Sequence, residues 1–282
     1  MTPRTALSIA GSDPSGGAGI QADLKTFAAL GVHGMAALAG LTAQNTRGVR
    51  AALPVEPEFV VAQVEAVLDD IEVHATKLGM LTNAGIAEAV ADLIASRRAD
   101  FGFLVLDPVM VATSGDRLLA DDAIVVIRER LAPLADLVTP NVPETAVLAG
   151  SSPAGNDVDL QAQAERLVAA GARAVLAKGG HLEGEELTDL LVTPYGTTRF
   201  TSSRVDTRNT HGTGCTLSSA IAAYAARSDA VPDDRVLGEV ISKARDFLHR
   251  AILSGADWRL SRFPDSGHGP VNHLINLEGA PQ

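Results

Sequence analysis

Short apolar runs alternate along the chain with longer stretches in which apolar residues recur every three or four positions. Residues 5–11 (TALSIAG) have the nearly unbroken apolar character of a buried strand. In residues 18–31, Ile20, Leu24 and Phe27 fall on one face of a helix. The same alternation predicts further strands at 34–46, 73–79, 101–110, 135–141 and 172–180, and further helices from near Pro57 and at 84–96, 121–134 and 160–171.

Repeated strand–helix units predict an α/β protein whose mostly parallel sheet is covered by helices on both faces. The pattern changes at 187–203, where two strand-like runs around Pro194 and Gly196 indicate a hairpin. Two helices, at about 214–227 and 234–253, follow it. No composition break separates parts of the chain, since the Ser/Pro/Gly-rich residues 151–157 suit a surface loop. We therefore expect a single domain over residues 1–282.

Composition and charge narrow the classes of partner. Hydrophobic residues make up 46% of the chain and aromatic residues 4%, which indicates a core of aliphatic side chains. The formal charge of −11 disfavours nucleic acid and anionic membranes as partners. No stretch approaches the roughly 20 apolar residues of a membrane span, and the N-terminus lacks the apolar run of a signal peptide. The single cysteine excludes an internal disulfide and favours the reducing cytoplasm.

Ligands of open parallel sheets bind at the carboxyl ends of the strands, and several marked stretches fall there. The glycine-rich residues 11–23 (GSDPSGGAGIQAD) read as a ligand loop or as a flexible turn, and they match neither a P-loop nor a dinucleotide fingerprint. Asp23, inside the next helix, either reaches back toward a ligand or is a solvated charge. Gln44, in TAQNT, either recognises the polar edge of a heteroaromatic ring or ends a strand.

Two later strand ends carry acidic or amide side chains. Asp107 directly follows the apolar residues 103–106, so it stands at the exit of a buried strand. In TPNVPE, Asn141 and Glu144 have the oxygen ligands that suit a hydrated Mg²⁺. The alternative is that Asn141 caps a helix and Glu144 lies in its first turn.

The only cysteine lies in NTHGTGC (209–215), at the start of an Ala-rich helix. Backbone N–H groups at such a helix end bind a phosphate or a developing negative charge. The helix dipole is expected to lower the pKa of the Cys215 thiol below about 8.5, which would raise the thiolate fraction. The alternative is that Cys215 is a small apolar residue packed under the helix.

These residues carry a family resemblance. DTRNTHGTGC resembles the anion-hole motif of the ribokinase superfamily, and a cysteine at its last position resembles the hydroxymethylpyrimidine/phosphomethylpyrimidine kinases of thiamine biosynthesis. Further matches occur in order between residues 8 and 274: IAGSDPSGGAGIQADLKT, LTAQNT, KLGML, LDPVMVATSG, TPNVPE, KGGH and SGHGPVNHL. The resemblance implies a ribokinase-like three-layer α/β/α sandwich.

The resemblance also implies an activity. It is the ATP-dependent phosphorylation of 4-amino-5-hydroxymethyl-2-methylpyrimidine and of its monophosphate, with Mg²⁺ and with a monovalent cation as a further candidate cofactor. A pyridoxal kinase is the nearest alternative, and a catalytically silent vitamin-binding protein is another. Because related kinases are often dimers, the resemblance implies a homodimer.

The resemblance assigns roles residue by residue. Cys215 would be the catalytic base, and Asn141 and Glu144 would lie in the Mg²⁺ and phosphate region. Residues 267–273 receive no clear role, although a place near the nucleotide is expected. The remaining assignments are the substrate site at Gly11, Asp23, Gln44, Met80 and Asp107, the anion hole at Gly212, Thr213 and Gly214, and nucleotide phosphates at Lys178, Thr210 and Gly212.

Overall fold

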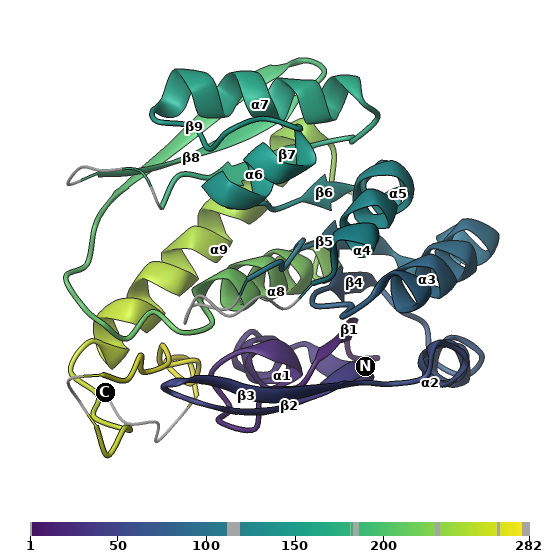
Figure 1. Ribbon diagram of the computed structural model, residues 1–282, viewed down its shortest axis with the longest axis horizontal. Helices are drawn as coiled ribbons and strands as arrows, with labels where there is room; N and C mark the ends of the chain where they lie inside the picture. The colour runs from purple at the N-terminus through teal and green to yellow at the C-terminus, as the bar shows by residue number, and fades with distance from the viewer. Residues whose placement is uncertain are drawn as a thin grey trace.

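In the part of the chain that the structure describes, nine strands form one sheet at the centre of the molecule (Figure 1). The computed structural model describes residues 2–111, 119–180, 182, 186–228, 232–263 and 266–277. Within them the strand order is β3-β2-β1-β4-β5-β6-β7-β8-β9. The strands are β1 Thr5–Gly11, β2 His33–Asn45, β3 Gly48–Pro54, β4 Ala75–Leu78, β5 Phe103–Leu106, β6 Leu137–Val138, β7 Val175–Lys178, β8 Glu186–Thr193 and β9 Gly196–Ser203.

The six strands from β2 to β7 in the sheet order are parallel, so their carboxyl ends share one edge. The outer strands β3, β8 and β9 pair antiparallel with their neighbours. The helices are α1 Gly19–Ala29, α2 Pro57–Leu68, α3 Ala84–Arg97, α4 Asp121–Val126, α5 Ala132–Leu134, α6 Val142–Leu148, α7 Asp157–Ala169, α8 Thr213–Ala226 and α9 Asp234–Gly255.

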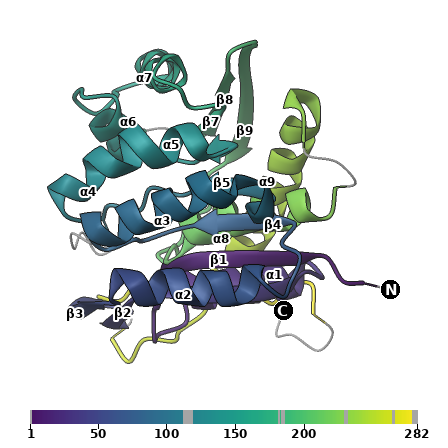
Figure 2. The same ribbon diagram turned by 90° about the vertical axis from the view of Figure 1, so that its right-hand side faces the viewer.

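Both faces of the sheet are buried, as the apolar strand runs predict. In β5, Phe103 and Val105 pack into a core with α1, α8 and α9, whereas Leu104 and Leu106 pack into a second core with α2, α3, α4 and α7. Figure 2 shows α7 and α9 on opposite sides of the β8–β9 hairpin. The three-layer α/β/α arrangement is therefore confirmed, and the single domain over residues 1–282 stays a prediction.

Strand β3 is the main element that the sequence pattern misses. Most of its side chains are exposed, so no apolar alternation marks it. Its backbone pairs antiparallel with β2, for example Ala43 with Ala51, and the register shifts between Ala43 and Gln44. Gln44 therefore lies on a projecting hairpin and not at a simple strand end. Residues 112–115 of the LDPVMVATSG match and His181 of KGGH lie outside the described residues.

Candidate active site

The N-terminus of α8 is the centre of the site. Gly212 precedes its first turn in the left-handed conformation, with φ 81° and ψ 10°. A Cβ atom at Gly212 would lie 1.8 Å from the carbonyl oxygen of Gly17, so both the conformation and the close approach require glycine. Thr213 and Gly214 form the first turn, where backbone N–H groups lack partners within the helix. The carbonyl of Thr210 accepts a hydrogen bond from Thr213 N–H at 3.3 Å, so Thr210 supports this turn.

A lysine–aspartate pair lies beside that turn. Lys178, at the end of β7, donates from Nζ to Asp107 Oδ1 at 3.0 Å. A Cβ atom on Gly214 would lie 3.4 Å from Lys178 Nζ, which places the ammonium group at the helix end. Burial alone would raise the pKa of Asp107, but Lys178 and Lys77 hold it below its usual value. The structure thus brings Lys178 and Asp107 together with the predicted anion hole.

Cys215 lies in the same turn, half-buried, but with a thiol pKa opposite in direction to the prediction. Burial raises this pKa to about 11, and the nearby carboxylates of Asp23 and Asp107 add to the rise. Lys77 and the backbone N–H of Gly19 oppose this rise in pKa without reversing it. The prediction of a lowered pKa is therefore wrong, because burial outweighs the positive end of the helix.

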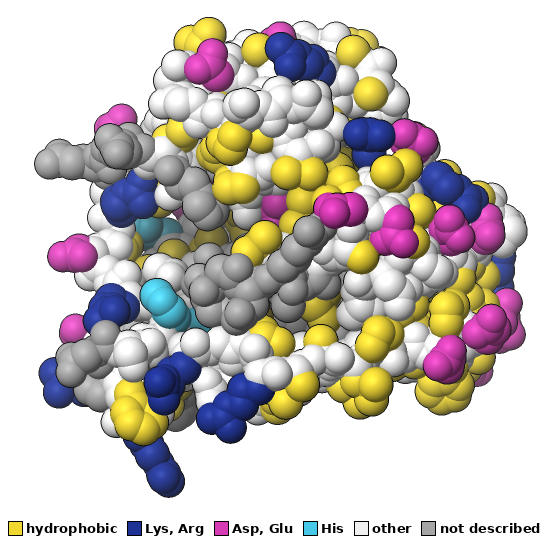
Figure 3. Space-filling model, in the orientation of Figure 1, with side chains coloured by type: hydrophobic (Ala, Val, Ile, Leu, Met, Phe, Trp, Pro, Cys, Tyr) yellow, Lys and Arg dark blue, Asp and Glu magenta, His cyan; other side chains and the backbone are white. Residues whose placement is uncertain are grey.

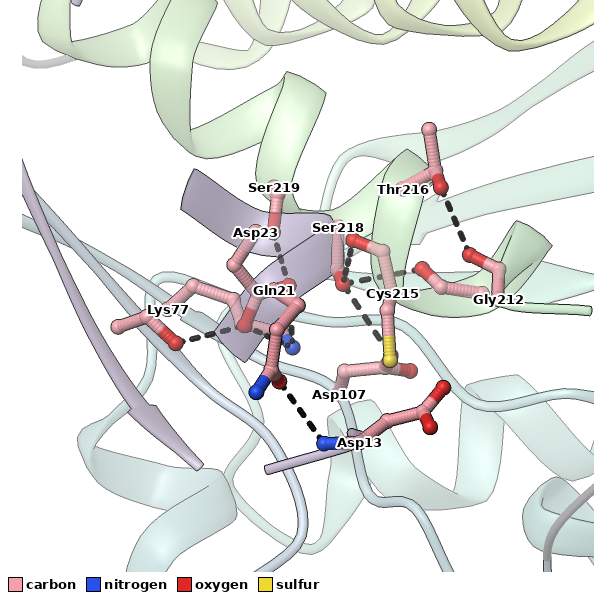
Figure 4. A network of polar contacts seen from close by, with 12 residues as sticks. Asp13, Gln21, Asp23, Lys77, Asp107, Gly212, Cys215, Thr216, Ser218 and Ser219 are labelled. Atoms are coloured by element: carbon pink, nitrogen blue, oxygen red, sulfur yellow. Dashed lines mark hydrogen bonds and ion pairs between the residues drawn. The ribbon is translucent and has the colours of Figure 1, made fainter. Parts of the chain in front are cut away.

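A second lysine–aspartate pair lies beside the turn, to the left of Cys215 in Figure 4. Lys77 Nζ is 2.9 Å from both carboxylate oxygens of Asp23, and neither side chain is exposed. Ser8 and Ser219 also donate to this carboxylate, each at 2.6 Å. Asp23 therefore has no exposed surface and supports the site from within the protein. The prediction that it lines the substrate pocket is corrected for this reason. Lys77 lies within the apolar run of β4, and a lysine at such a position was the signal that could have revealed the partner of Asp23.

Residues assigned to the pyrimidine also gather near this helix end. Met80 Cε lies 2.2 Å from where a Cβ atom of Gly11 would be, so glycine at the end of β1 leaves room for the methionine. Gln44 Oε1 accepts from Thr42 Oγ1 at 3.2 Å, and its amide nitrogen is 3.5 Å from His211 Nε2. Gln44 is half-buried, so its amide remains within reach of a ligand.

Asn141 and Glu144 form the helix cap that was the alternative to a metal site. Asn141 Oδ1 accepts from Glu144 N–H at 2.9 Å, and Glu144 Oε2 accepts from Asn141 N–H at 2.8 Å. This reciprocal pair begins α6, so the capping interpretation is confirmed. Burial raises the pKa of Glu144 to about 7, with Asp107 adding to the rise and Lys178 opposing it.

The same carboxylate fits a hydrated magnesium ion. A cation beside Glu144 would favour its ionised form, and Mg²⁺ in kinases commonly takes one or two carboxylates while phosphates and waters complete its shell. Within the described ranges, no group of three or more His, Cys, Asp or Glu side chains is arranged to hold a metal ion by itself. A metal here would thus depend on the nucleotide phosphates, and the metal role of Asn141 and Glu144 stays a prediction.

Two features of the site were not assigned from the sequence. Asp13 and His211 form a buried pair, with Asp13 Oδ2 2.7 Å from His211 Nε2. The segment 267–273 packs behind the anion-hole turn, where His273 Nε2 is 3.0 Å from Thr216 Oγ1. A histidine within the glycine-rich turn NTHGTG was the available signal for the first pair.

The distribution of charge differs between the two ends of the molecule. Figure 3 shows Asp and Glu side chains on the right, over α2 and α3, and Lys and Arg side chains at the lower left, over the end of the β2–β3 hairpin and the C-terminal segment. Arg47, at the hairpin turn, stacks on Phe263 with its guanidinium carbon 4.8 Å from the ring centroid. The cationic end is the one to which the parallel strands point, which favours anionic ligands despite the net charge of −11.

Comparisons with known proteins agree with this geometry. The family model described as phosphomethylpyrimidine kinase matches residues 13–272. A hydroxymethylpyrimidine/phosphomethylpyrimidine kinase of Rhizobium meliloti is 51% identical over 271 residues, covering 95% of this chain and 96% of the relative. The enzyme of the same name from Salmonella typhimurium is 46% identical over 269 residues, covering 95% and 97%.

Solved structures of kinases have the same fold. A Bacillus subtilis pyridoxal kinase in complex with ADP superposes with a TM-score of 0.85 at 34% identity, covering 98% of this chain and all of that one. A phosphomethylpyrimidine kinase from Clostridium difficile 630 has a TM-score of 0.75 at 37% identity, covering 88% and 99%. The fold and site thus define a vitamin kinase of the ribokinase-like class. Within that class, the chain belongs to the phosphomethylpyrimidine kinase family.

Proposed function

We propose that this enzyme transfers the γ-phosphoryl group of ATP to 4-amino-5-hydroxymethyl-2-methylpyrimidine and then to the resulting monophosphate, in thiamine biosynthesis. The observation that carries this proposal is the convergence at one helix end of the glycine turn 212–214, Lys178 and Cys215, with Gln44 close by. The relatives at 45–51% identity have names that specify both phosphorylations.

Different residues have different roles in the proposed phosphoryl transfer. The N–H groups of the first turn of α8 and Lys178 Nζ stabilise the charge on the transferred group, which is the larger share of catalysis in such reactions. In its thiolate form, Cys215 accepts the proton of the substrate hydroxyl as the new O–P bond forms, which returns it to the thiol. Gln44 orients the pyrimidine through its polar edge. When bound through Glu144 and the phosphates, Mg²⁺ would neutralise phosphate charge.

A pyridoxal kinase is the second candidate, because pyridoxal kinases are among the solved structures most similar to this chain. The test is ADP release with three acceptors: the pyrimidine alcohol, its monophosphate and pyridoxal. We expect turnover of both pyrimidines with a kcat/KM well above that of pyridoxal. A higher kcat/KM for pyridoxal would overturn the assignment. ADP release with none of them would favour the catalytically silent alternative.

Replacing Glu144 with glutamine tests the magnesium assignment. An amide keeps the size of the side chain and can still accept from Asn141 N–H, but it lacks the negative charge that holds a divalent cation. The Mg²⁺ concentration for half-maximal activity should rise about tenfold, while the melting temperature changes by only a few degrees. Activity and thermal unfolding measured across a Mg²⁺ titration check this. Early melting with an unaltered titration would leave Glu144 with its capping role alone.

We also propose a homodimer in the cytoplasm. Leu41 and Leu53 face each other across β2 and β3 and are 43% and 64% exposed, while Phe59 at the start of α2 is 63% exposed. Such apolar surface suits contact with a second copy of the chain, and sedimentation as a monomer would contradict this.

The proposed location is consistent with the chemistry of the single cysteine, because the reducing cytoplasm would keep Cys215 as a thiol. Among the described residues, no helix has the length and apolar character to cross a bilayer.

A further inference from the structure

The buried pair of Asp13 and His211 joins two segments that are 198 residues apart in the chain. Both side chains are almost fully enclosed, with 3% and 7% of their surfaces exposed. Because a carboxylate only accepts hydrogen bonds, the 2.7 Å contact places the proton on His211 Nε2. Burial alone would raise the pKa of Asp13, but hydrogen bonds from His211 and Ser15 lower it to about 2, so Asp13 is ionised at neutral pH.

Asp13 fixes the loop that leads into α1. Its carboxylate accepts from the backbone N–H groups of Ser15, Gly17 and Ala18 at 2.8, 3.2 and 2.9 Å, and from Ser15 Oγ at 2.9 Å. This loop ends at Gly19, whose backbone N–H acts on the thiol of Cys215 and lowers its pKa. The Asp13 side chain therefore determines the path of the backbone near Cys215, the predicted catalytic base.

His211 fixes the same loop against the anion-hole turn. It directly precedes Gly212, and a Cβ atom on Gly17 would lie 2.4 Å from its Cδ2 atom, so the ring packs on the loop backbone. Its backbone N–H donates to Gly269 O at 3.0 Å, which ties it to the segment 267–273. Its Nε2 atom also lies 3.5 Å from the amide of Gln44.

We propose that Asp13 and His211 are a positioning pair for phosphoryl transfer, holding the loop of residues 13–19 in register with the glycine turn 212–214. The pair touches neither the transferred group nor the hydroxyl proton. It sets the distance between the pyrimidine, read by Gln44, and the N–H groups that receive the phosphoryl charge. This inference rests on the proposed kinase activity of the site.

The distance between the pyrimidine and the N–H groups of the glycine turn should affect the rate of phosphoryl transfer more than the affinity for either substrate. A misplacement of about 1 Å between reacting groups can cost about 10²-fold in rate. Loss of the pair should therefore lower kcat, whereas the KM for ATP should change little because Lys178 and the turn amides remain. Some ADP release without phosphorylated product is also expected, since water enters a site whose acceptor is poorly held.

The test compares substitutions of His211 in the full-length enzyme. His211→Phe keeps a ring of similar size but removes the donor to Asp13, and we expect kcat to fall about 10²-fold. His211→Gln retains an N–H donor and should recover most of that loss. Asp13→Asn also removes acceptors of the loop amides, so it should lower kcat on its own, but by a smaller factor in the His211→Phe background, where the shared contact is already lost.

The matched control is His74→Phe, the same substitution at a histidine that hydrogen-bonds Thr5 at the opposite end of β1. It should leave kcat and both KM values unchanged. All variants are assayed below their melting temperatures, so that kcat refers to folded protein. A wild-type kcat for His211→Phe, or additive effects of Asp13→Asn and His211→Phe, would overturn the positioning role. A wild type inactive on every acceptor would overturn the proposed function instead.

Discussion

Gly212→Ala is expected to reduce kcat by about 10²- to 10³-fold, the usual cost of losing one oxyanion donor. The added methyl group would meet Gly17 O at 1.8 Å, and alanine is disfavoured at φ 81°. The turn must therefore shift away from the loop of residues 13–19, which moves its N–H groups from the phosphoryl group. Steady-state kinetics and the melting temperature measure the effect.

Gly31→Ala is the control for Gly212→Ala, because it introduces backbone strain without a steric clash. Gly31 has φ 71° between α1 and β2, with no atom within 4 Å of an added Cβ. It should cost about 1 to 2 kcal/mol of stability without changing kcat. If Gly212→Ala also keeps its kcat and loses only stability, the glycine turn is a fold requirement and not the phosphoryl-binding element.

Cys215→Ala is expected to lower kcat by about 10²- to 10⁴-fold, the range for loss of a general base. The wild-type kcat/KM should increase with pH from 7 to 10, because a free thiol with a pKa of about 11 gains thiolate throughout that range. The alanine variant should lose that pH dependence. Pyrimidine phosphorylation followed across this range, with melting curves at each pH, tests both expectations.

Cys215→Asp is the companion variant, since it replaces one proton acceptor with another. If Cys215 transfers the proton, the aspartate variant should retain more activity than the alanine variant. Packing under the helix predicts the reverse order, because a buried carboxylate near Asp23 and Asp107 is destabilising. An alanine variant with normal turnover and an unchanged pH profile would remove Cys215 from the mechanism.

Local patterns predicted the elements well where side chains are buried. The helical spacing of Ile20, Leu24 and Phe27 predicted a helix at 18–31, and α1 spans Gly19–Ala29. Strand β3 escaped prediction because backbone pairing with β2, and not a buried face, holds it in place. The pattern of apolar residues thus predicts only elements with a buried face, and it does not predict a strand that is mostly exposed.

The sequence predicts candidate site residues, but it predicts only part of the environment in which the structure places them. The glycine turn before α8 follows from its sequence, and its backbone geometry follows from helix ends in general. The pairing of Lys77 with Asp23 spans 54 residues, so no local pattern contains it. The same holds for the raised pKa of Cys215, because the burial and the carboxylates that cause it are brought together by the fold.

The contacts between residues 13–46 and 209–273 have a consequence for how the enzyme is made. His211 contacts Asp13, and His268 N–H donates to Thr46 O at 2.8 Å, so residues 13–46 reach these contacts only after residues 209–273 have been synthesised. Contacts of such sequence separation form late, because a long loop must close before they stabilise anything. During synthesis the early strands and α1 can assemble on the ribosome, but the catalytic centre cannot. Phosphoryl transfer should therefore begin only when residues up to about 273 have left the exit tunnel.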